Sequence, residues 1–232
     1  MKITYGIQAS PIRYTEYAKR LERDLYAEGI DHVDLCVDFF MIGCWGGAKK
    51  VWERTPADST HRVLLQEDVI LCKGFAEHVR RIVEAVPDKM ISLYASPYFK
   101  DGVAWAKRND YSFFKAVGGA AGQGLIMPIE MVRDFMAWQE TNVKKGSRGD
   151  DVRYYGYMVE TGQHCYVAVP SVIEHAAPMD SSVGYNHKGK VAVDFIGDRE
   201  QDWSKIPPDG SWIFSKRGAV ADAWYKRYAK SS

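Results

Sequence analysis

The chain has 232 residues, of which 46% are hydrophobic and 26% charged, a composition typical of a globular protein with one compact domain. Its 31 basic and 30 acidic residues leave a formal net charge of +1, so no overall field indicates a polyanionic partner. Its four cysteines form no Cys-x-x-Cys pair and no apolar run approaches the roughly 18 residues of a membrane span, so we expect a cytoplasmic protein without structural zinc or a membrane segment.

The first half of the chain alternates between expected strands and helices, the pattern of an α/β fold with a mostly parallel sheet. Apolar runs of strand length alternate with stretches in which apolar residues recur at helical spacing. The strands are expected at residues 3–7, 33–37, 63–65 and 90–94, and the helices at residues 15–28, 48–54 and 75–86.

The second expected strand ends at an acid, Asp38. An acid at this place either binds a ribose or a base or is an ordinary strand-end residue. Gly43, Gly46 and Gly47 follow and precede a helix, where backbone amides can approach a phosphate, although the spacing matches no established phosphate-binding motif.

The third expected strand gives the clearest indication of chemistry, because its apolar run stops abruptly in Gln66-Glu67-Asp68. Ligands of open α/β sheets bind at the carboxyl ends of the strands. Glu67 and Asp68 there can hold Mg²⁺ or Mn²⁺, which prefer carboxylate oxygen, or they can simply begin a solvated turn. Because neighbouring strand residues point to opposite faces, we expect Glu67 to point away from Asp68.

Residues 95–118 are rich in aromatic and polar side chains and are expected to form an irregular binding loop. A small-residue stretch containing Gly122 and Gln123 follows, which is either a hinge or a place where a ligand approaches the backbone. A short strand over residues 125–128 and a helix over residues 129–141 come next.

Two successive acids, Asp150 and Asp151, open a further expected helix over residues 152–161 after a basic loop at residues 144–149. Both cannot occupy the N-cap, so capping explains one of the two acids and leaves the other free for another role. A strand over residues 165–169 then leads to His175, which is either a metal ligand or a histidine satisfied near the core. We expect one domain over residues 1–202 and a basic, aromatic C-terminal extension over residues 203–232.

The order of these features resembles the GT-A class of nucleotide-sugar glycosyltransferases in its small bacterial and phage form. In that class an apolar strand ends in a short acidic motif, often Asp-x-Asp, for which Gln66-Glu67-Asp68 stands here. The match continues through the small-residue strand, the acid pair at a helix start, and the stretch from Pro170 to His175. It spans roughly residues 3–184 and implies a Rossmann-like GT-A sheet flanked by helices.

The resemblance implies roles for particular residues. Asp68 would bind Mn²⁺ or Mg²⁺, and His175 would complete the coordination. Asp150 and Asp151 would serve the acceptor: we assign Asp150 to capping and Asp151 to the orientation or deprotonation of the acceptor hydroxyl. The candidate residues for a nucleoside-diphosphate sugar donor are Gln8, Asp38, Gln66, Glu67, Gly122, Gln123, Ser181 and Ser182.

The leading interpretation is therefore a metal-dependent glycosyltransferase. Its acceptor hydroxyl belongs either to a saccharide, such as a surface polysaccharide, or to a hydroxymethylated pyrimidine in phage DNA, for which the basic, aromatic tail would bind phosphates and bases. A nucleotidyltransferase is a related alternative, which usually carries a Gly-rich, basic signature after its first strand. A non-enzymatic nucleic-acid-binding protein is the alternative from another class, without a recognisable binding motif.

Overall fold

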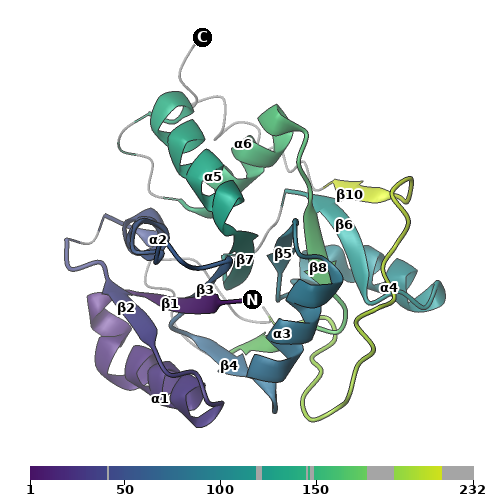
Figure 1. Cartoon of the computed structure of the whole chain (residues 1–232), viewed down its shortest axis with the longest axis horizontal. Helices are drawn as coiled ribbons and strands as arrows, with labels where there is room; N and C mark the ends of the chain where they lie inside the picture. Colours follow the sequence, from purple (N-terminus) through teal and green to yellow (C-terminus); the bar gives the residue numbers. More distant parts are fainter. Residues whose placement is uncertain (41, 119–121, 145, 147–148, 177–190, 216–232) are drawn as a thin grey trace.

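The computed structural model describes residues 1–40, 42–118, 122–144, 146, 149–176 and 191–215 (Figure 1). In this part of the chain an eight-stranded sheet has the order β10-β6-β8-β5-β7-β3-β1-β2. β1 is parallel to β2 and β3, and β5 is parallel to β8, whereas β7 lies antiparallel between β3 and β5. The strands are β1 Ile3–Ala9, β2 Val33–Val37, β3 His61–Gln66, β5 Met90–Ser92, β6 Phe113–Val117, β7 Gly124–Pro128, β8 Cys165–Ala168 and β10 Ile213–Ser215.

Helices cover both faces of this sheet, as Figure 1 shows. The helices α1 (Lys19–Ala27) and α3 (Phe75–Ala85) pack on one face. The helices α2 (Cys44–Glu53), α5 (Ile129–Asn142) and α6 (Asp151–Thr161) pack on the other. The prediction of a mixed α/β fold with a large, mostly parallel sheet flanked by helices is confirmed.

The central strand β3 is buried on both faces, as its apolar run predicts. Val63 and Leu65 pack with α1 and α3, while Leu64 packs with α2 and α5, and all three side chains are 0% exposed. Strand geometry sends successive side chains to opposite faces, so a sheet covered twice needs an uninterrupted apolar strand. This burial fixes the point at which the chain leaves the core, immediately before Glu67 and Asp68.

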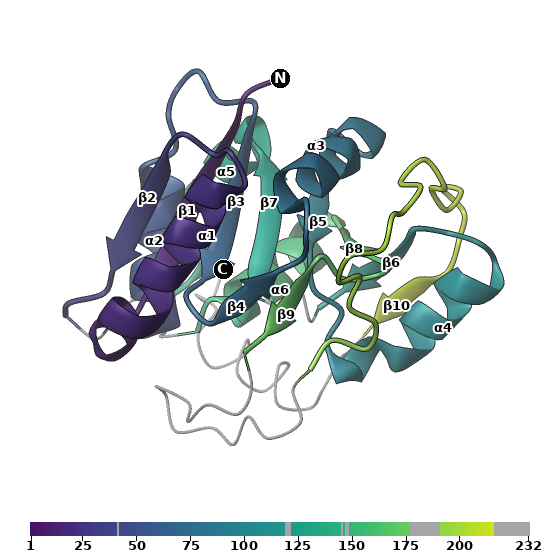
Figure 2. The same cartoon turned by 90° about the horizontal axis from the view of Figure 1, so that it is seen from below.

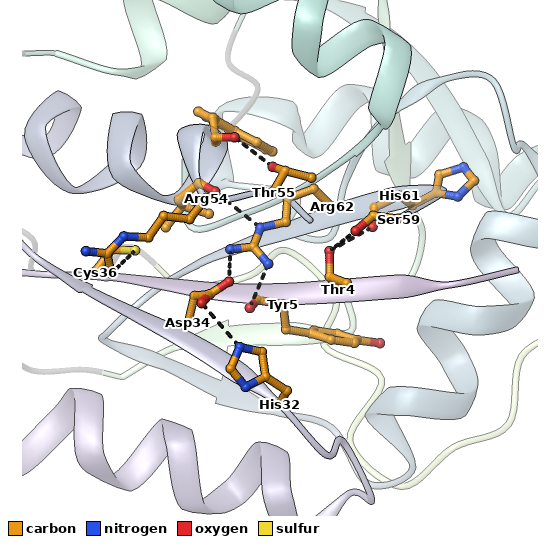
Figure 3. A network of polar contacts seen from close by, with 12 residues as sticks. Thr4, Tyr5, His32, Asp34, Cys36, Arg54, Thr55, Ser59, His61 and Arg62 are labelled. Atoms are coloured by element: carbon orange, nitrogen blue, oxygen red, sulfur yellow. Dashed lines mark hydrogen bonds and ion pairs between the residues drawn. The ribbon is translucent and has the colours of Figure 1, made fainter. Parts of the chain in front are cut away.

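One charged residue of β3, Arg62, lies inside the protein (Figure 3). Its Nη2 is 2.6 Å from Asp34 Oδ2 on β2, and its Nη1 and Nε donate to the carbonyl oxygens of Tyr5 and Val51 at 3.1 and 3.3 Å. A buried charge persists when its donors are paired in this way. Gly6 provides the space for the guanidinium, because a Cβ at this position would lie 2.7 Å from Arg62 Nη2.

The expectation of an irregular loop over residues 95–118 is wrong. The segment contains a 3-10 turn at Pro97–Phe99, the helix α4 (Lys100–Arg108) and the strand β6. Three of its aromatic residues lie in the core, since Phe99, Phe113 and Phe114 are at most 2% exposed, whereas Tyr98 is 64% exposed.

The C-terminal segment up to Ser215 packs on the sheet. Trp203 is 2% exposed, its ring lies 5.7 Å from that of Phe113, and its indole N–H donates to His78 Nδ1 at 3.1 Å. β10 then pairs in parallel with β6. Residues 216–232, which hold the most basic part of the expected extension, lie outside the described residues.

Candidate functional site

The ends of the strands β1, β2 and β3 bring Gln8, Asp38 and Gln66 to one edge of the sheet, because the three strands run in parallel. Backbone hydrogen bonds continue the connections beyond the strands. The amide of Glu67 donates to the Gln8 carbonyl at 3.1 Å, and that of Gln66 donates to the Gln123 carbonyl at 2.9 Å. Residues far apart in the sequence, each predicted to bind a donor, therefore lie together.

The acid pair Glu67 and Asp68 lies in the turn after β3 and is buried, at 7% and 5% exposure. Arg13 Nη1 is 2.6 Å from Asp68 Oδ2 and 3.9 Å from Glu67 Oε1. Both carboxylates thus face one guanidinium, and the expectation that Glu67 points away is wrong. Strand alternation ends at Gln66, and the turn that follows places neighbouring side chains on the same side.

His175 reaches Asp68 through a small second sheet that the sequence did not reveal. The short strands β4 (Val69–Leu71) and β9 (Ile173–His175) pair antiparallel, with Val69 opposite His175. Figure 2 shows them side by side near the lower end of the main sheet. The Ala176 amide donates to the Asp68 carbonyl at 2.8 Å, and His175 Nε2 lies 3.4 Å from Asp68 Oδ2.

The two acids differ in protonation. Burial, reinforced by the charge of Asp68, raises the pKa of Glu67 to about 7. Burial also acts on Asp68, but the hydrogen bond and charge of His175, together with the Arg13 guanidinium, hold the pKa of Asp68 below its usual value. Near neutral pH the pair therefore carries the charge of Asp68 and a partly protonated Glu67.

The predicted metal ligands fit a divalent cation in part. Asp68 Oδ1 is buried without a hydrogen-bond partner, and the same carboxylate lies beside His175. Within the described residues no cluster of three or more His, Cys, Asp or Glu side chains could hold a metal ion. Since Mg²⁺ and Mn²⁺ often keep water and substrate phosphate as ligands, this set of residues suits an ion that arrives with a phosphorylated substrate.

Asp150 begins α6 and closes the other side of the site. Its Oδ1 accepts the Asp151 amide at 2.8 Å, so it caps the helix, and its Oδ2 accepts a bond from Gln8 Nε2 at 3.1 Å. A Cβ on Gly122 would lie 2.8 Å from Asp150 Oδ2 and 3.3 Å from Gln66 Nε2. The glycine is therefore explained by the close approach of these side chains.

The two acids of α6 stand in different environments. Asp150 is 4% exposed, and burial raises its pKa even though Gln8 and the helix amide favour the charged form. Asp151 is exposed, and its Oδ1 accepts the Val152 amide at 2.9 Å. The assignment of Asp151 to the acceptor stays a prediction, and Asp150 combines capping with a position inside the site.

Asp38 lies at the start of α2. Its Oδ2 accepts the Gly43 amide at 2.9 Å, whereas its Oδ1 is buried without a hydrogen-bond partner. A Cβ on Gly46 would lie 2.7 Å from Asp38 Cγ. These glycines thus accommodate a protein carboxylate at a helix N-terminus, where the helix dipole favours negative charge.

Sequence reasoning missed Arg13 and Ser10, which belong to the acid pair's surroundings. Ser10 Oγ donates to Glu67 Oε1 at 3.3 Å. The signal for Arg13 is weak, because a lone arginine after Pro11 is ordinary in a surface turn. The candidate residues Ser181 and Ser182 lie outside the described part of the chain.

Of three comparisons with known proteins, one found matches. No protein-family model and no curated protein matches the chain. Among solved structures, 22 chains match, including one described as the inositol-1-phosphate CTP transferase from T. maritima. That structure has a TM-score of 0.38 and 10% identity, covering 81% of this chain and 74% of the other, and so carries no argument about activity.

Across the residues that the structure describes, no helix combines the length and apolarity needed to cross a membrane.

Proposed function

We propose that the protein is a metal-dependent glycosyltransferase that moves a sugar from a nucleoside-diphosphate sugar to an acceptor hydroxyl. The observation that carries the proposal is the meeting of Asp68 and His175, with Nε2 3.4 Å from Oδ2, at the carboxyl edge of an α/β sheet. This edge is where such sheets bind ligands, and a carboxylate with an imidazole can share one divalent cation.

On this proposal Asp68 and His175 hold Mn²⁺ or Mg²⁺ through oxygen and nitrogen. The ion supplies positive charge for the diphosphate that leaves when the bond to the sugar breaks. Gln8, Asp38 and Gln123 each have a side-chain oxygen that is buried without a hydrogen-bond partner, and these oxygens can accept bonds from donor hydroxyls or a base.

Asp150 and Asp151 serve the acceptor. A carboxylate within hydrogen-bond reach of a hydroxyl orients it and takes up its proton as the new bond forms. Asp151 is exposed to solvent at the start of α6, and Asp150 is a positioning residue whose Oδ2 accepts the bond from Gln8. The acceptor is a saccharide hydroxyl or the hydroxyl of a hydroxymethylated pyrimidine in DNA. Transfer assays with oligosaccharides and with modified DNA distinguish these two classes of acceptor.

One observation favours a second candidate, a nucleotidyltransferase. The loop after β1 lacks a glycine-rich signature but places a buried arginine, Arg13, against the acid pair. A cation at this point can neutralise the phosphates of a nucleoside triphosphate. The two activities differ in the product, because sugar transfer releases a nucleoside diphosphate and nucleotidyl transfer releases pyrophosphate.

The test begins with a thermal-shift panel of nucleotide sugars and nucleoside triphosphates, with and without Mn²⁺, since a bound ligand raises the unfolding temperature by mass action. Stabilisation by a nucleotide sugar that needs Mn²⁺ is expected. The stabilising donor is then offered to oligosaccharides and to DNA containing 5-hydroxymethylpyrimidines, and nucleoside diphosphate and pyrophosphate are measured.

Asp68→Asn is the matched variant, because it keeps the shape of the side chain and removes its charge. It should lose the Mn²⁺-dependent shift, whereas Asp88→Asn, at an exposed surface acid, should keep it. Release of pyrophosphate from a triphosphate would favour the second candidate. An unchanged shift in Asp68→Asn would refute the metal assignment.

A further inference from the structure

Arg13 lies against the carboxylate oxygen of Asp68 that a metal ion would need. It ends a short 3-10 turn, Pro11–Arg13, directly after β1, and it is 7% exposed. Its Nη1 lies 2.6 Å from Asp68 Oδ2, the same oxygen that is 3.4 Å from His175 Nε2. The guanidinium is therefore within the space that Asp68 and His175 would share around a cation.

The arginine already balances the site electrically. Its Nη1 lies 2.6 Å from Asp68 Oδ2 and 3.9 Å from Glu67 Oε1, so both buried carboxylates already face one fixed positive charge. A divalent cation that enters beside Arg13 meets a positive charge at close range in a buried place, where screening by salt is weak. The free ion should consequently bind poorly.

A diphosphate changes this balance, because arginine pairs with phosphate oxygens through two parallel hydrogen bonds. If Arg13 pairs with a phosphate, its guanidinium no longer occupies Asp68 Oδ2. The phosphate also adds negative charge and oxygen ligands for the ion. Binding of the metal and of the diphosphate then favour each other, and such a coupling is reciprocal.

We propose that Arg13 is an internal cation that competes with the divalent metal for Asp68 and makes metal binding depend on the nucleotide diphosphate. This inference rests on the proposed function and adds a regulatory role for a residue outside the metal-binding pair. Arg13 is a positioning residue here, since its effect on the ion is exerted through Asp68.

The experiment measures Mn²⁺ binding directly, by the loss of the free-ion electron paramagnetic resonance signal, without turnover. Wild-type protein is titrated alone and with the member of a panel of UDP, CDP, GDP, ADP and dTDP that most raises its unfolding temperature. A titration without protein measures the Mn²⁺ that the nucleotide binds by itself, and this amount is subtracted from the titrations with protein. We expect the nucleotide to tighten Mn²⁺ binding by tenfold or more, within the usual range of coupling.

Arg13→Gln removes the competing charge and is expected to bind Mn²⁺ alone at least about tenfold more tightly than wild type, while the nucleotide adds less further affinity. Arg13→Lys keeps the charge and should behave like wild type in the absence of nucleotide. Arg23→Gln, at an exposed position of α1, is the matched control and should leave both titrations unchanged.

Two results would overturn the inference alone: equal or weaker Mn²⁺ affinity in Arg13→Gln, or wild-type binding of Mn²⁺ that does not respond to the nucleotide. The wild-type titrations decide the matter even if Arg13→Gln does not fold. If no nucleotide leads to Mn²⁺ binding in wild type or variants, the metal-dependent function fails together with the inference.

Discussion

Replacement of Glu67 by glutamine tests whether the acid pair is built as described. Glu67 is 7% exposed, and its pKa rises from the ordinary 4.5 to about 7. The folded protein therefore holds this proton more tightly than the unfolded chain does. The resulting stabilisation is complete below a pH of about 4.5 and is lost as the pH rises through about 7.

The size of the effect follows from the shift in the pKa of Glu67. A rise to about 7 corresponds to about 3 kcal/mol of folding free energy between pH 4.5 and 8. Glu67→Gln is neutral at every pH and can still accept the bond from Ser10, so it should escape this loss. Asp68 contributes little to the comparison, because its lowered pKa keeps it ionised over the same range.

The assay is urea unfolding of wild type and variant at pH 5 and at pH 8 in the same buffer salt. The stability of Glu67→Gln relative to wild type should increase by about 2.5 kcal/mol between the two conditions, slightly less than over the full range because Glu67 is already partly ionised in the unfolded chain at pH 5. Glu53→Gln, at an exposed glutamate of α2, controls for the loss of one surface charge. A difference between Glu67→Gln and wild type that stays constant with pH would show that Glu67 does not take up a proton as described.

Three other predictions concern stability and turnover. Asp150→Ala should lose about 2 kcal/mol in urea unfolding, from the helix cap and the bond to Gln8, whereas Asp151→Asn should leave stability unchanged and lower turnover by roughly 10². Asp34→Ala leaves the buried Arg62 charge without its carboxylate and should destabilise by about 3 kcal/mol, more than Asp34→Asn. Gly122→Ala forces a methyl group toward Asp150 and should lower the midpoint by the equivalent of about 1–3 kcal/mol. Asp150→Ala that is as stable as wild type, Asp34→Ala no weaker than Asp34→Asn, or Gly122→Ala with an unchanged midpoint would each contradict the corresponding contact.

The main sheet could be predicted from sequence because its strands are buried on both faces. An uninterrupted apolar run such as residues 63–65 is typical of a central strand that is covered on both faces. Its exit into Glu67 and Asp68 could be predicted for the same reason. The structure of residues 95–118 could not be predicted from their aromatic content, since aromatic side chains suit a core as well as a binding loop.

The contact between His175 and Asp68 followed from the resemblance to a known family and not from the hydrophobic pattern, and the approach of Arg13 and Ser10 could not be predicted. β4 and β9 are three residues each, too short for periodicity to reveal, yet their pairing brings His175 to Asp68. Likewise, the direction of the Glu67 side chain depends on whether the strand ends one residue earlier or later. Such choices depend on contacts between distant segments, which hydrophobic patterns along the chain do not contain.

The contact between Gln8 and Asp150 joins residues separated by 142 positions. During synthesis at about 5–20 residues per second, Gln8 leaves the ribosome roughly 7–28 s before Asp150. In that interval β1 has a polar side chain waiting for its partner and an edge that β3 covers sooner than α6 can arrive. The nascent protein can therefore collapse around its apolar strands early, and the side of the site formed by Asp150 closes only after well over half of the chain has been made.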